Sequence, residues 1–344
     1  MAGQTRDHGF HPLRVAEVIR ETADARSFVL EVPAELAGAY KYDAGQFLTF
    51  RVYVDGEPYL RCYSMSSAPG VDESMQVTVK RVVGGAVSNW MVDNLASGDP
   101  VEATVPAGVF CLPDGDGDGD GDVVAFGAGS GITPILSIIK TALATTSRRV
   151  HLLYANRDRD STIFAGALDE LAEQFPDRLH VVHHLDVEQG FVDVDAVAQF
   201  AETAPGAEHF ICGPPAFMDI VEAALLERGV ADTAIHIERF TPPQEEAPDP
   251  DTPVDATVTI ELKGETSTTE HHPGSTILQT ARQMGMSPPF SCESGSCASC
   301  MAKLVDGAAE MRTNNALTPD EVEEGWVLTC QAVPTTPSVH VVYE

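Results

Sequence analysis

Residues 291–300 read SCESGSCASC, and a further cysteine, Cys330, follows after 29 intervening residues. Cys292 and Cys297 enclose four residues, whereas Cys297 and Cys300 enclose two. The chain has 7 cysteines, and its polar start lacks the apolar core of a signal peptide. An odd count in a chain that is not exported argues against a disulfide framework. The clustered cysteines therefore predict a metal centre.

The spacing C-x4-C-x2-C…C is typical of a plant-type [2Fe–2S] centre, in which four thiolates hold two irons. A zinc ribbon would need a second C-x2-C pair, which the sequence lacks. A Rieske centre would need two histidines, and no histidine occurs between residues 273 and 339. The predicted cluster ligands are Cys292, Cys297, Cys300 and Cys330.

The chain of 344 residues carries 52 acidic and 21 basic side chains, for a formal net charge of −31. So acidic a surface repels phosphate backbones, which excludes nucleic-acid binding through a basic surface. The hydrophobic content of 43% is ordinary for a globular protein. No stretch reaches the ~18 apolar residues of a membrane helix. We therefore expect a cytoplasmic protein that binds neither nucleic acid nor membrane.

Two segments divide the chain. Residues 241–253, TPPQEEAPDPDTP, combine prolines with acids, which predicts an extended linker. Residues 114–122, DGDGDGDGD, predict a solvated loop, because an EF-hand starting there would need a glutamate where Ala125 stands. The predicted domains are residues 10–113, 122–240 and 254–344, with 241–253 as the linker.

The first two domains differ in their hydrophobic pattern. Short β-branched and aromatic runs such as 46–54 recur through residues 10–113, which predicts an antiparallel β-barrel. One helix interrupts them at 89–96, with Ser88 as its N-cap. Residues 122–240 alternate strands with helices, which predicts an α/β domain with a parallel sheet. Ligands bind such sheets at the carboxyl ends of the strands.

The third domain is small and mixed. A β-hairpin is predicted to turn at Lys263-Gly264, and a helix follows between Ser275 as N-cap and Gly285 as its end. The cysteine loop and two further strands complete an α+β domain.

Two motifs in the barrel region suit a flavin dinucleotide. Arg61 offers a fork for a pyrophosphate, Tyr63 a ring to stack on an isoalloxazine, and Ser64 a donor near the flavin N5. A later glycine turn presents backbone N–H groups at the start of a helix, which is an anion site. The predicted FAD-binding residues in these motifs are Arg61, Cys62, Tyr63, Ser64, Gly84, Gly85, Ala86, Val87 and Ser88.

A second glycine-rich turn precedes the first helix of the α/β domain, where a dinucleotide pyrophosphate would meet free N–H groups. It is not a Rossmann fingerprint, because Ile132 stands where that motif needs glycine, and it lacks the lysine of a P-loop. The predicted nucleotide-binding residues in this turn are Gly127, Gly129, Ser130, Gly131, Thr133 and Pro134.

Two more segments end strands at this edge of the sheet. The first, Cys212-Gly213-Pro214, has a cysteine that could equally be a small core residue. The second contains Asn156 and Arg157, followed by Asp158-Arg159. An acid there would bind a free ribose 2′-OH and an arginine a 2′-phosphate, so the spacing leaves NADH and NADPH both open.

The order of these motifs resembles the ferredoxin–NADP reductase superfamily: R-x-Y-S, a V-x-V-K strand, G-G-x-x-S, G-x-G-x-G-x-x-P and C-G-P. With the cysteine quartet appended, residues 10 to 344 resemble oxygenase reductase components ordered FAD, NAD, ferredoxin. The motifs RCYSMSS, LYANRD, ICGPPAFM and HIERF are most similar to reductases of 3-ketosteroid 9α-hydroxylases. Reductases of phenylacetyl-CoA epoxygenases share the layout and come second.

This resemblance implies a β-grasp fold for the ferredoxin domain and adds FAD contacts from the V-x-V-K strand, at Val77, Val79 and Lys80. It places Cys212 near the nicotinamide, and it implies that Phe240 covers the flavin ring, although Phe240 could instead fill a core. It also favours NADH over NADPH.

The resulting prediction is a monomeric reductase that passes electrons from NADH to FAD, then to the [2Fe–2S] cluster, then to a Rieske-type oxygenase of steroid or aromatic catabolism. Ser64, Cys212 and Phe240 are its predicted catalytic residues. The alternatives are a reductase of phenylacetyl-CoA epoxygenase, one for another NADPH-dependent oxygenase, and an iron–sulfur electron carrier or redox sensor without a flavin site.

Overall fold

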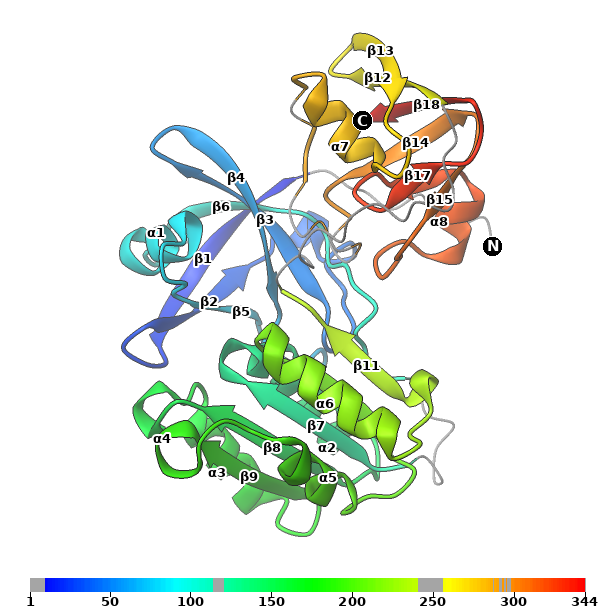
Figure 1. Ribbon diagram of the computed structural model, residues 1–344. Helices are drawn as coiled ribbons and strands as arrows, with labels where there is room; N and C mark the ends of the chain where they lie inside the picture. The colour runs from blue at the N-terminus through cyan, green and yellow to red at the C-terminus, as the bar shows by residue number, and fades with distance from the viewer. Residues whose placement is uncertain are drawn as a thin grey trace.

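The computed structural model describes residues 10–113, 121–240, 256–286, 288–290, 293, 295 and 298–343. Figure 1 shows three units in chain order: an antiparallel sheet, a parallel sheet between helices, and a smaller mixed unit. The predicted fold class of barrel, α/β domain and α+β domain is therefore confirmed. The predicted linker and most of the Asp-Gly loop lie outside the described residues. No helix in the described ranges is long and apolar enough to cross a membrane.

The first unit is a single antiparallel sheet in the order β4-β3-β6-β1-β2-β5. Its strands are β1 (His11–Arg20), β2 (Ala25–Glu31), β3 (Phe47–Val54), β4 (Glu57–Ser64), β5 (Met75–Lys80) and β6 (Pro100–Ala103). An isolated antiparallel bridge between Met65 and Val77 joins the end of β4 to β5, so the two edges of the sheet meet at one end. Apolar side chains such as Phe28, Leu48 and Phe50 fill the interior.

Helix α1 (Ala86–Asn94) of this unit begins earlier than predicted. Its N-cap is Gly85, and Ser88 lies inside the first turn, where its Oγ accepts a hydrogen bond from the N–H of Val82 at 3.1 Å. The prediction of Ser88 as N-cap was wrong because a serine hydroxyl can satisfy a backbone donor from inside the turn as well as from its start.

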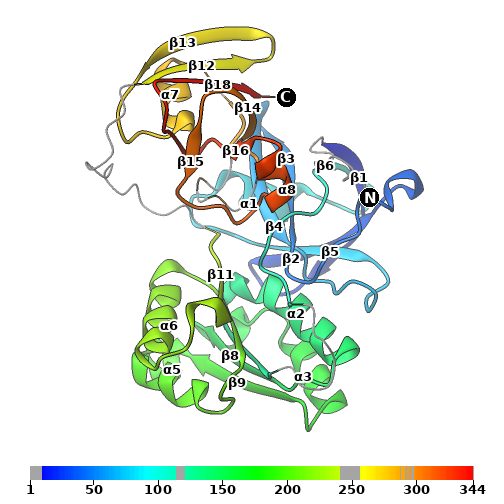
Figure 2. The ribbon, with the colours of Figure 1, turned by 90° about the vertical axis from the view of Figure 1, so that its right-hand side faces the viewer.

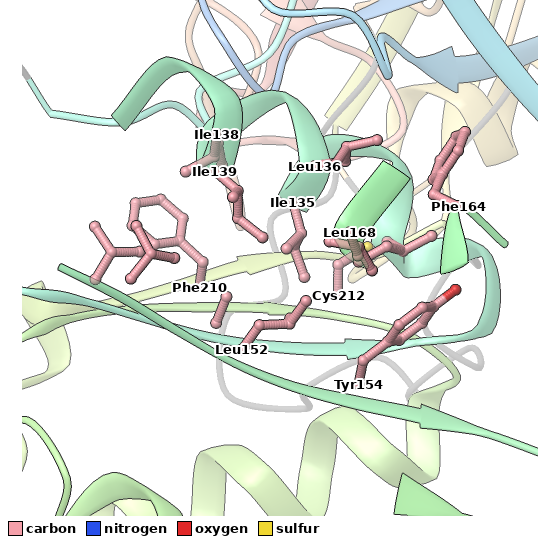
Figure 3. Close-up of a cluster of buried hydrophobic side chains, with 14 of the residues drawn as sticks. Ile135, Leu136, Ile138, Ile139, Leu152, Tyr154, Phe164, Leu168, Phe210 and Cys212 are labelled. Carbon is pink, nitrogen blue, oxygen red and sulfur yellow. The ribbon is translucent and has the colours of Figure 1, made fainter. Parts of the chain in front are cut away.

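The second unit has a five-stranded parallel sheet in the order β11-β10-β7-β8-β9. Its strands are β7 (Val123–Ala128), β8 (Val150–Asn156), β9 (Leu179–Leu185), β10 (Glu208–Cys212) and β11 (Ile235–Glu238). Helices α2 (Ile132–Thr145) and α3 (Ala165–Gln174) pack on one face, whereas α5 (Val194–Ala201) and α6 (Pro215–Glu227) pack on the other. The short helix α4 (Asp186–Gln189) follows β9. Figure 3 shows Cys212 among the buried side chains beneath α2.

The barrel and the α/β domain share a core. Ala25, Ala44 and Phe110 of the barrel side belong to the same buried cluster as the apolar face of α2. At the margin of this contact, the Nζ of Lys140 lies 3.0 Å from a carboxylate oxygen of Asp72. Helix α2 is therefore held directly against the barrel, which fixes the start of the helix relative to strands β4 and β5.

The third unit contains one mixed sheet in the order β13-β12-β18-β14-β16. Its elements are β12 (Ala256–Leu262), β13 (Glu265–His271), α7 (Ile277–Gln283), β14 (Met301–Asp306), β15 (Ala309–Met311), α8 (Pro319–Glu323), β16 (Trp326–Leu328), β17 (Ala332–Pro334) and β18 (Ser338–Tyr343). The first and last strands, β12 and β18, pair in parallel at the centre of the sheet. In Figures 1 and 2 this unit lies next to the barrel, at the opposite end of the molecule from α3 and α5.

Local structure in this unit follows the predicted turn chemistry closely. Lys263 and Gly264 both have positive φ, as a tight hairpin turn requires. The N-cap of α7 is Thr276, whose side chain forms a capping box with Gln279, so the predicted N-cap at Ser275 is off by one residue. Both hydroxyl residues can cap a helix, but only Thr276 has a glutamine three positions later.

Candidate functional site

The glycine-rich turn after β7 lies against the turn after β10. A Cβ on Gly131 would lie 2.0 Å from the carbonyl oxygen of Cys212, and a Cβ on Gly213 would lie 2.8 Å from the Cβ of Ala128. Cys212 also pairs in register with Gly127. The two predicted nucleotide segments are therefore one continuous surface at the carboxyl edge of the sheet, and only glycine permits their close approach.

A glycine-rich helical turn, Gly129–Gly131, leads into α2, and the N–H of Ile132 already donates to the carbonyl of Gly129. Helix α2 begins at Ile132 with Gly131 as its N-cap, and no side chain caps it. The hydroxyl of Thr133, a predicted nucleotide-binding residue, donates to the carbonyl of Ser130 at 3.0 Å. The unpartnered N–H groups of this helical start therefore lie in the glycine turn, where a pyrophosphate would also meet the positive end of the helix dipole.

The side chain of Lys80 extends from the barrel to this edge of the parallel sheet. Its Nζ lies 3.6 Å from the point where a Cβ on Gly129 would stand. Lys80 ends β5, the V-x-V-K strand, whereas Gly129 begins the turn before α2. A basic side chain from the predicted flavin domain therefore reaches the predicted nucleotide turn, which joins the two sites in space.

Strand β4 carries the predicted flavin residues with alternating orientation. Tyr63 packs its ring edge-to-face on Phe50, with centroids 5.8 Å apart, and burial raises the pKa of its hydroxyl. Arg61 is exposed and donates to the carbonyl of Leu60. Cys62 packs instead against Phe47 and Ala107, so its thiol faces away from Arg61 and Tyr63.

Ser64, Val77, Val79 and Val87 are almost fully buried. The three valines belong to the barrel core, so any contact they make with a cofactor comes from their backbone. In the turn before α1, Gly84 has a φ of +74°, and the N–H of the N-cap Gly85 donates to the carbonyl of Val82 at 2.9 Å. The N–H groups of Gly84 and of the uncapped first turn of α1 fit the phosphate part of FAD.

Cys212 ends β10 without any exposed surface. Burial raises the pKa of its thiol, and the nearby carboxylate of Glu238 raises the pKa further. Glu238 lies opposite Cys212 in the parallel pairing of β10 with β11 and is 8% exposed. Glu238 was not among the site residues predicted from the sequence. A charged residue that ends a strand at the same sheet edge was the signal that could have found it.

Phe240 lies just beyond β11 and is 42% exposed. This exposure disfavours the alternative that it fills a core. An exposed aromatic two residues after Glu238 is free to cover a planar ring at this edge.

The charged side chains of the segment after β8 form ion pairs and hydrogen bonds with one another. The carboxylate of Asp158 accepts hydrogen bonds from the Nε of Arg157 at 2.7 Å and from the N–H of Ser161 at 2.9 Å. Arg157 and Arg159 extend into solvent, where Arg159 lies 3.8 Å from Glu188. Asn156 is buried at the end of β8. The acid is fixed at the sheet edge, whereas both arginines are exposed surface groups.

Two of the four predicted cluster ligands, Cys300 and Cys330, are described and buried in one apolar cluster. Cys292 and Cys297 lie outside the described residues. Between them, Glu293 is held by two hydrogen bonds from the guanidinium of Arg282, at 2.9 and 2.8 Å.

Gly295 in the same loop has a φ of +77°, and a Cβ there would lie 2.6 Å from the carbonyl oxygen of Thr313. Glu293 and Ala298 also adopt positive φ. Residues with positive φ are typical of loops that form anion-binding concavities with their N–H groups, and such a loop fits a cluster whose sulfurs accept hydrogen bonds.

The fold and the site together define a flavin-dependent pyridine nucleotide oxidoreductase with an attached iron–sulfur domain. The chain matches the oxidoreductase FAD-binding domain over residues 12–111, the oxidoreductase NAD-binding domain over 126–223, and the 2Fe-2S iron-sulfur cluster binding domain over 260–335. Its cofactors are therefore FAD, NAD(H) and a [2Fe–2S] cluster.

Similar proteins extend over the whole chain. The 3-ketosteroid-9-alpha-monooxygenase ferredoxin reductase components of Mycolicibacterium smegmatis and Rhodococcus rhodochrous are 42% and 41% identical, covering 96% and 94% of both chains. A component of the 1,2-phenylacetyl-CoA epoxidase of Escherichia coli is 35% identical over 97% of this chain and 98% of its own. The crystal structure of phthalate dioxygenase reductase, 27% identical, superposes with a TM-score of 0.61 over 97% of this chain and 98% of that chain.

The chain belongs to the family of ferredoxin reductase components of oxygenases, with FAD, NAD and [2Fe–2S] domains in that order. As a reductase component it has a terminal oxygenase as its partner. The FAD and NAD domains favour this interpretation over an iron–sulfur carrier without a flavin site.

Proposed function

We propose that this reductase takes electrons from NADH and delivers them singly to a Rieske-type terminal oxygenase that acts on a 3-ketosteroid. The observation that carries the proposal is the approach of Lys80 to the turn at Gly129, which puts the flavin strand and the nucleotide turn at one edge. Bound FAD would accept two electrons as hydride and release them one at a time to the cluster.

The residues of the chain would prepare this transfer as follows. Arg61 and the N–H groups of Gly84 and of the first turn of α1 would bind the FAD phosphates, because Arg61 is exposed and no side chain caps the helix. The hydroxyl of Ser64 would donate near the flavin N5. Cys212 keeps its proton at neutral pH and is fully buried, so it would support the nicotinamide site from below as an uncharged core side chain.

The charges after β8 support NADH as the donor. Arg157 lowers the pKa of Asp158 by hydrogen bonding to its carboxylate, so that Asp158 is ionised at neutral pH. An ionised carboxylate accepts a hydrogen bond from a free ribose 2′-OH and repels a 2′-phosphate. Its ion pair also leaves Arg157 less able to attract that phosphate.

The Rieske type, the steroid substrate of the partner, the monomeric state and the cytoplasmic location belong to the proposal. The similarity to 3-ketosteroid-9-alpha-monooxygenase components supports the steroid oxygenase, and phthalate dioxygenase reductase supports a dioxygenase-type partner. Use of NADH and thiolate ligation of a cluster both suit a reducing cytoplasm.

One experiment tests the donor and the partner together. The purified reductase is reduced anaerobically with NADH or NADPH in a stopped-flow instrument, and is then coupled to a 3-ketosteroid oxygenase or to a phenylacetyl-CoA epoxidase. We expect faster reduction by NADH and turnover of the steroid. Equal efficiency with NADPH, or turnover of phenylacetyl-CoA alone, would contradict the proposal and favour the alternative partner within the family.

The relay through the cluster has its own test. Cys330→Ser should remove the visible bands of the cluster and abolish support of the oxygenase, while the flavin still reduces ferricyanide with NADH. Oxygenase turnover that survives the loss of the cluster would show that electrons bypass it.

A further inference from the structure

Tyr343 is the second-to-last residue of the chain, and it reaches from the final strand into the interior of the third unit. Its side chain is 4% exposed. Its hydroxyl donates a hydrogen bond to the Oγ1 of Thr329 at 2.8 Å, and Thr329 has no exposed surface. A buried tyrosine hydroxyl without a hydrogen-bond partner destabilises the fold, so loss of the Thr329 acceptor should lower stability.

Thr329 connects Tyr343 to the predicted cluster ligands by further hydrogen bonds. Its hydroxyl donates to the carbonyl oxygen of Cys300 at 2.7 Å, and its backbone N–H donates to the same oxygen at 3.2 Å. Thr329 immediately precedes Cys330 in the sequence. One residue therefore ties the backbone at Cys300 to the backbone at Cys330.

The series of hydrogen bonds continues through the peptide that follows Cys300. The N–H of Met301, in the same peptide as the carbonyl of Cys300, donates to the carbonyl of Ala298 at 3.0 Å. Ala298 adopts a left-handed φ of +53°, which is unfavourable for a residue with a Cβ. Hydrogen bonds in such a series polarise one another, and each donor here points toward the next member. The series stabilises the strained turn that precedes Cys300.

We propose that Tyr343 is a positioning residue for the [2Fe–2S] cluster, acting through Thr329 on the backbone of Cys300 and Cys330. The proposal rests on the proposed function, because it requires these two cysteines to be ligands. Partners that orient ligands contribute to metal retention, and hydrogen bonds around a cluster shift its reduction potential. These hydrogen bonds end on the carbonyl oxygens of Cys300 and Ala298 and not on a cysteine sulfur, so removing them should change the potential through the position of the two cysteines.

The test uses full-length holoprotein and four variants. Tyr343→Phe keeps the ring and removes only the hydroxyl. Thr329→Val removes the hydroxyl between Tyr343 and Cys300, whereas Thr329→Ser keeps a hydroxyl at that position. The matched control is Tyr40→Phe in the barrel, because Tyr40 is also 4% exposed and its hydroxyl donates to the carbonyl of Ala103 at 2.8 Å. Loss of the cluster to an iron chelator is followed by visible absorbance, and the potential is measured by titration with EPR detection.

We expect Tyr343→Phe to lose its cluster about 2- to 10-fold faster than the wild type, as removal of one buried hydrogen bond predicts. Thr329→Val should be faster still, because it leaves the Tyr343 hydroxyl unpaired. Both variants should have a potential that differs from that of the wild type. Thr329→Ser and Tyr40→Phe should match the wild type in both measurements.

Two results would overturn the inference. One is a wild-type rate of cluster loss in both Tyr343→Phe and Thr329→Val. The other is faster loss with an unchanged potential, which would assign Tyr343 to the stability of the fold alone. A wild-type protein that binds no cluster would instead overturn the proposed function, so the two failures are distinguishable.

Discussion

At the residue scale, Asp158 is the group that should set the choice of nucleotide. Its carboxylate is held by Arg157 and by the N–H of Ser161. Asp158→Asn removes the negative charge, keeps an acceptor, and releases Arg157 from its ion pair. We expect the ratio of kcat/KM for NADH to that for NADPH to fall about tenfold, the effect of losing one charged acceptor. Glu188→Gln, which changes a neighbouring charge at Arg159, is the control, and an equal fall in that variant would contradict the assignment.

The thiol of Cys111 should affect stability at alkaline pH. Burial raises its pKa from 9.0 to about 12, helped by the charges of Asp43 and Glu238. Between these values the folded protein keeps the proton and the unfolded chain releases it, so stability falls as pH rises through this window. In Cys111→Ala, the free energy of unfolding should fall less steeply with pH in this window, by up to about 1.4 kcal/mol per pH unit. Calorimetric Tm values from pH 8 to 11 measure the effect, and parallel curves for the two proteins would refute it.

At the scale of elements, the nucleotide edge depends on the contact between two turns. Gly131→Ala would place a methyl 2.0 Å from the carbonyl oxygen of Cys212, so one turn must move. We expect a cost of about 1–3 kcal/mol, typical of overpacking, seen as a lower Tm. Reduction by NADH should slow at least tenfold while the FAD content stays unchanged.

The control for this variant is Gly166→Ala in α3, where a Cβ would have no neighbour within 4 Å. Alanine is the better helix former by up to about 1 kcal/mol, so this variant should have an unchanged or slightly higher Tm and normal reduction. If both variants reduce flavin at the wild-type rate, the contact between the turns is not needed for transfer.

The elements that the sequence predicted well are those with strong local signals. The alternation of strands and helices in the α/β domain and the hairpin at Lys263-Gly264 depend on periodicity and turn residues that lie close together in the chain. The short strands β6 and β11 were missed because four residues carry too little pattern. Glu238 and Tyr343 were missed for another reason: each matters through a partner that is distant in sequence and near only after folding.

At the scale of the whole molecule, the net charge is −31, but the local charge differs between the nucleotide turn and the third unit. The turn before α2, which suits an anionic dinucleotide, lies next to the positive charge of Lys80. The third unit instead presents exposed acids on and beside α8, at Asp320, Glu323 and Glu324. The junction of the barrel and the α/β domain can therefore attract an anionic donor, while the third unit attracts a basic partner.

This arrangement predicts that electron delivery to the oxygenase depends on salt. Charges steer association over about a Debye length, which shortens from roughly 30 Å at 0.01 M to 10 Å at 0.1 M salt. The second-order rate of oxygenase reduction should fall as salt rises, and E323Q/E324Q should weaken this dependence and lower the rate several-fold at low salt. The matched control is D193N/D195N at α5, which removes two acids from the opposite end of the molecule and should leave the dependence unchanged. Reduction of the flavin by NADH should be the same in all three proteins. A rate that is independent of salt, or equal salt dependence in both double variants, would mean that the acids near α8 do not guide docking.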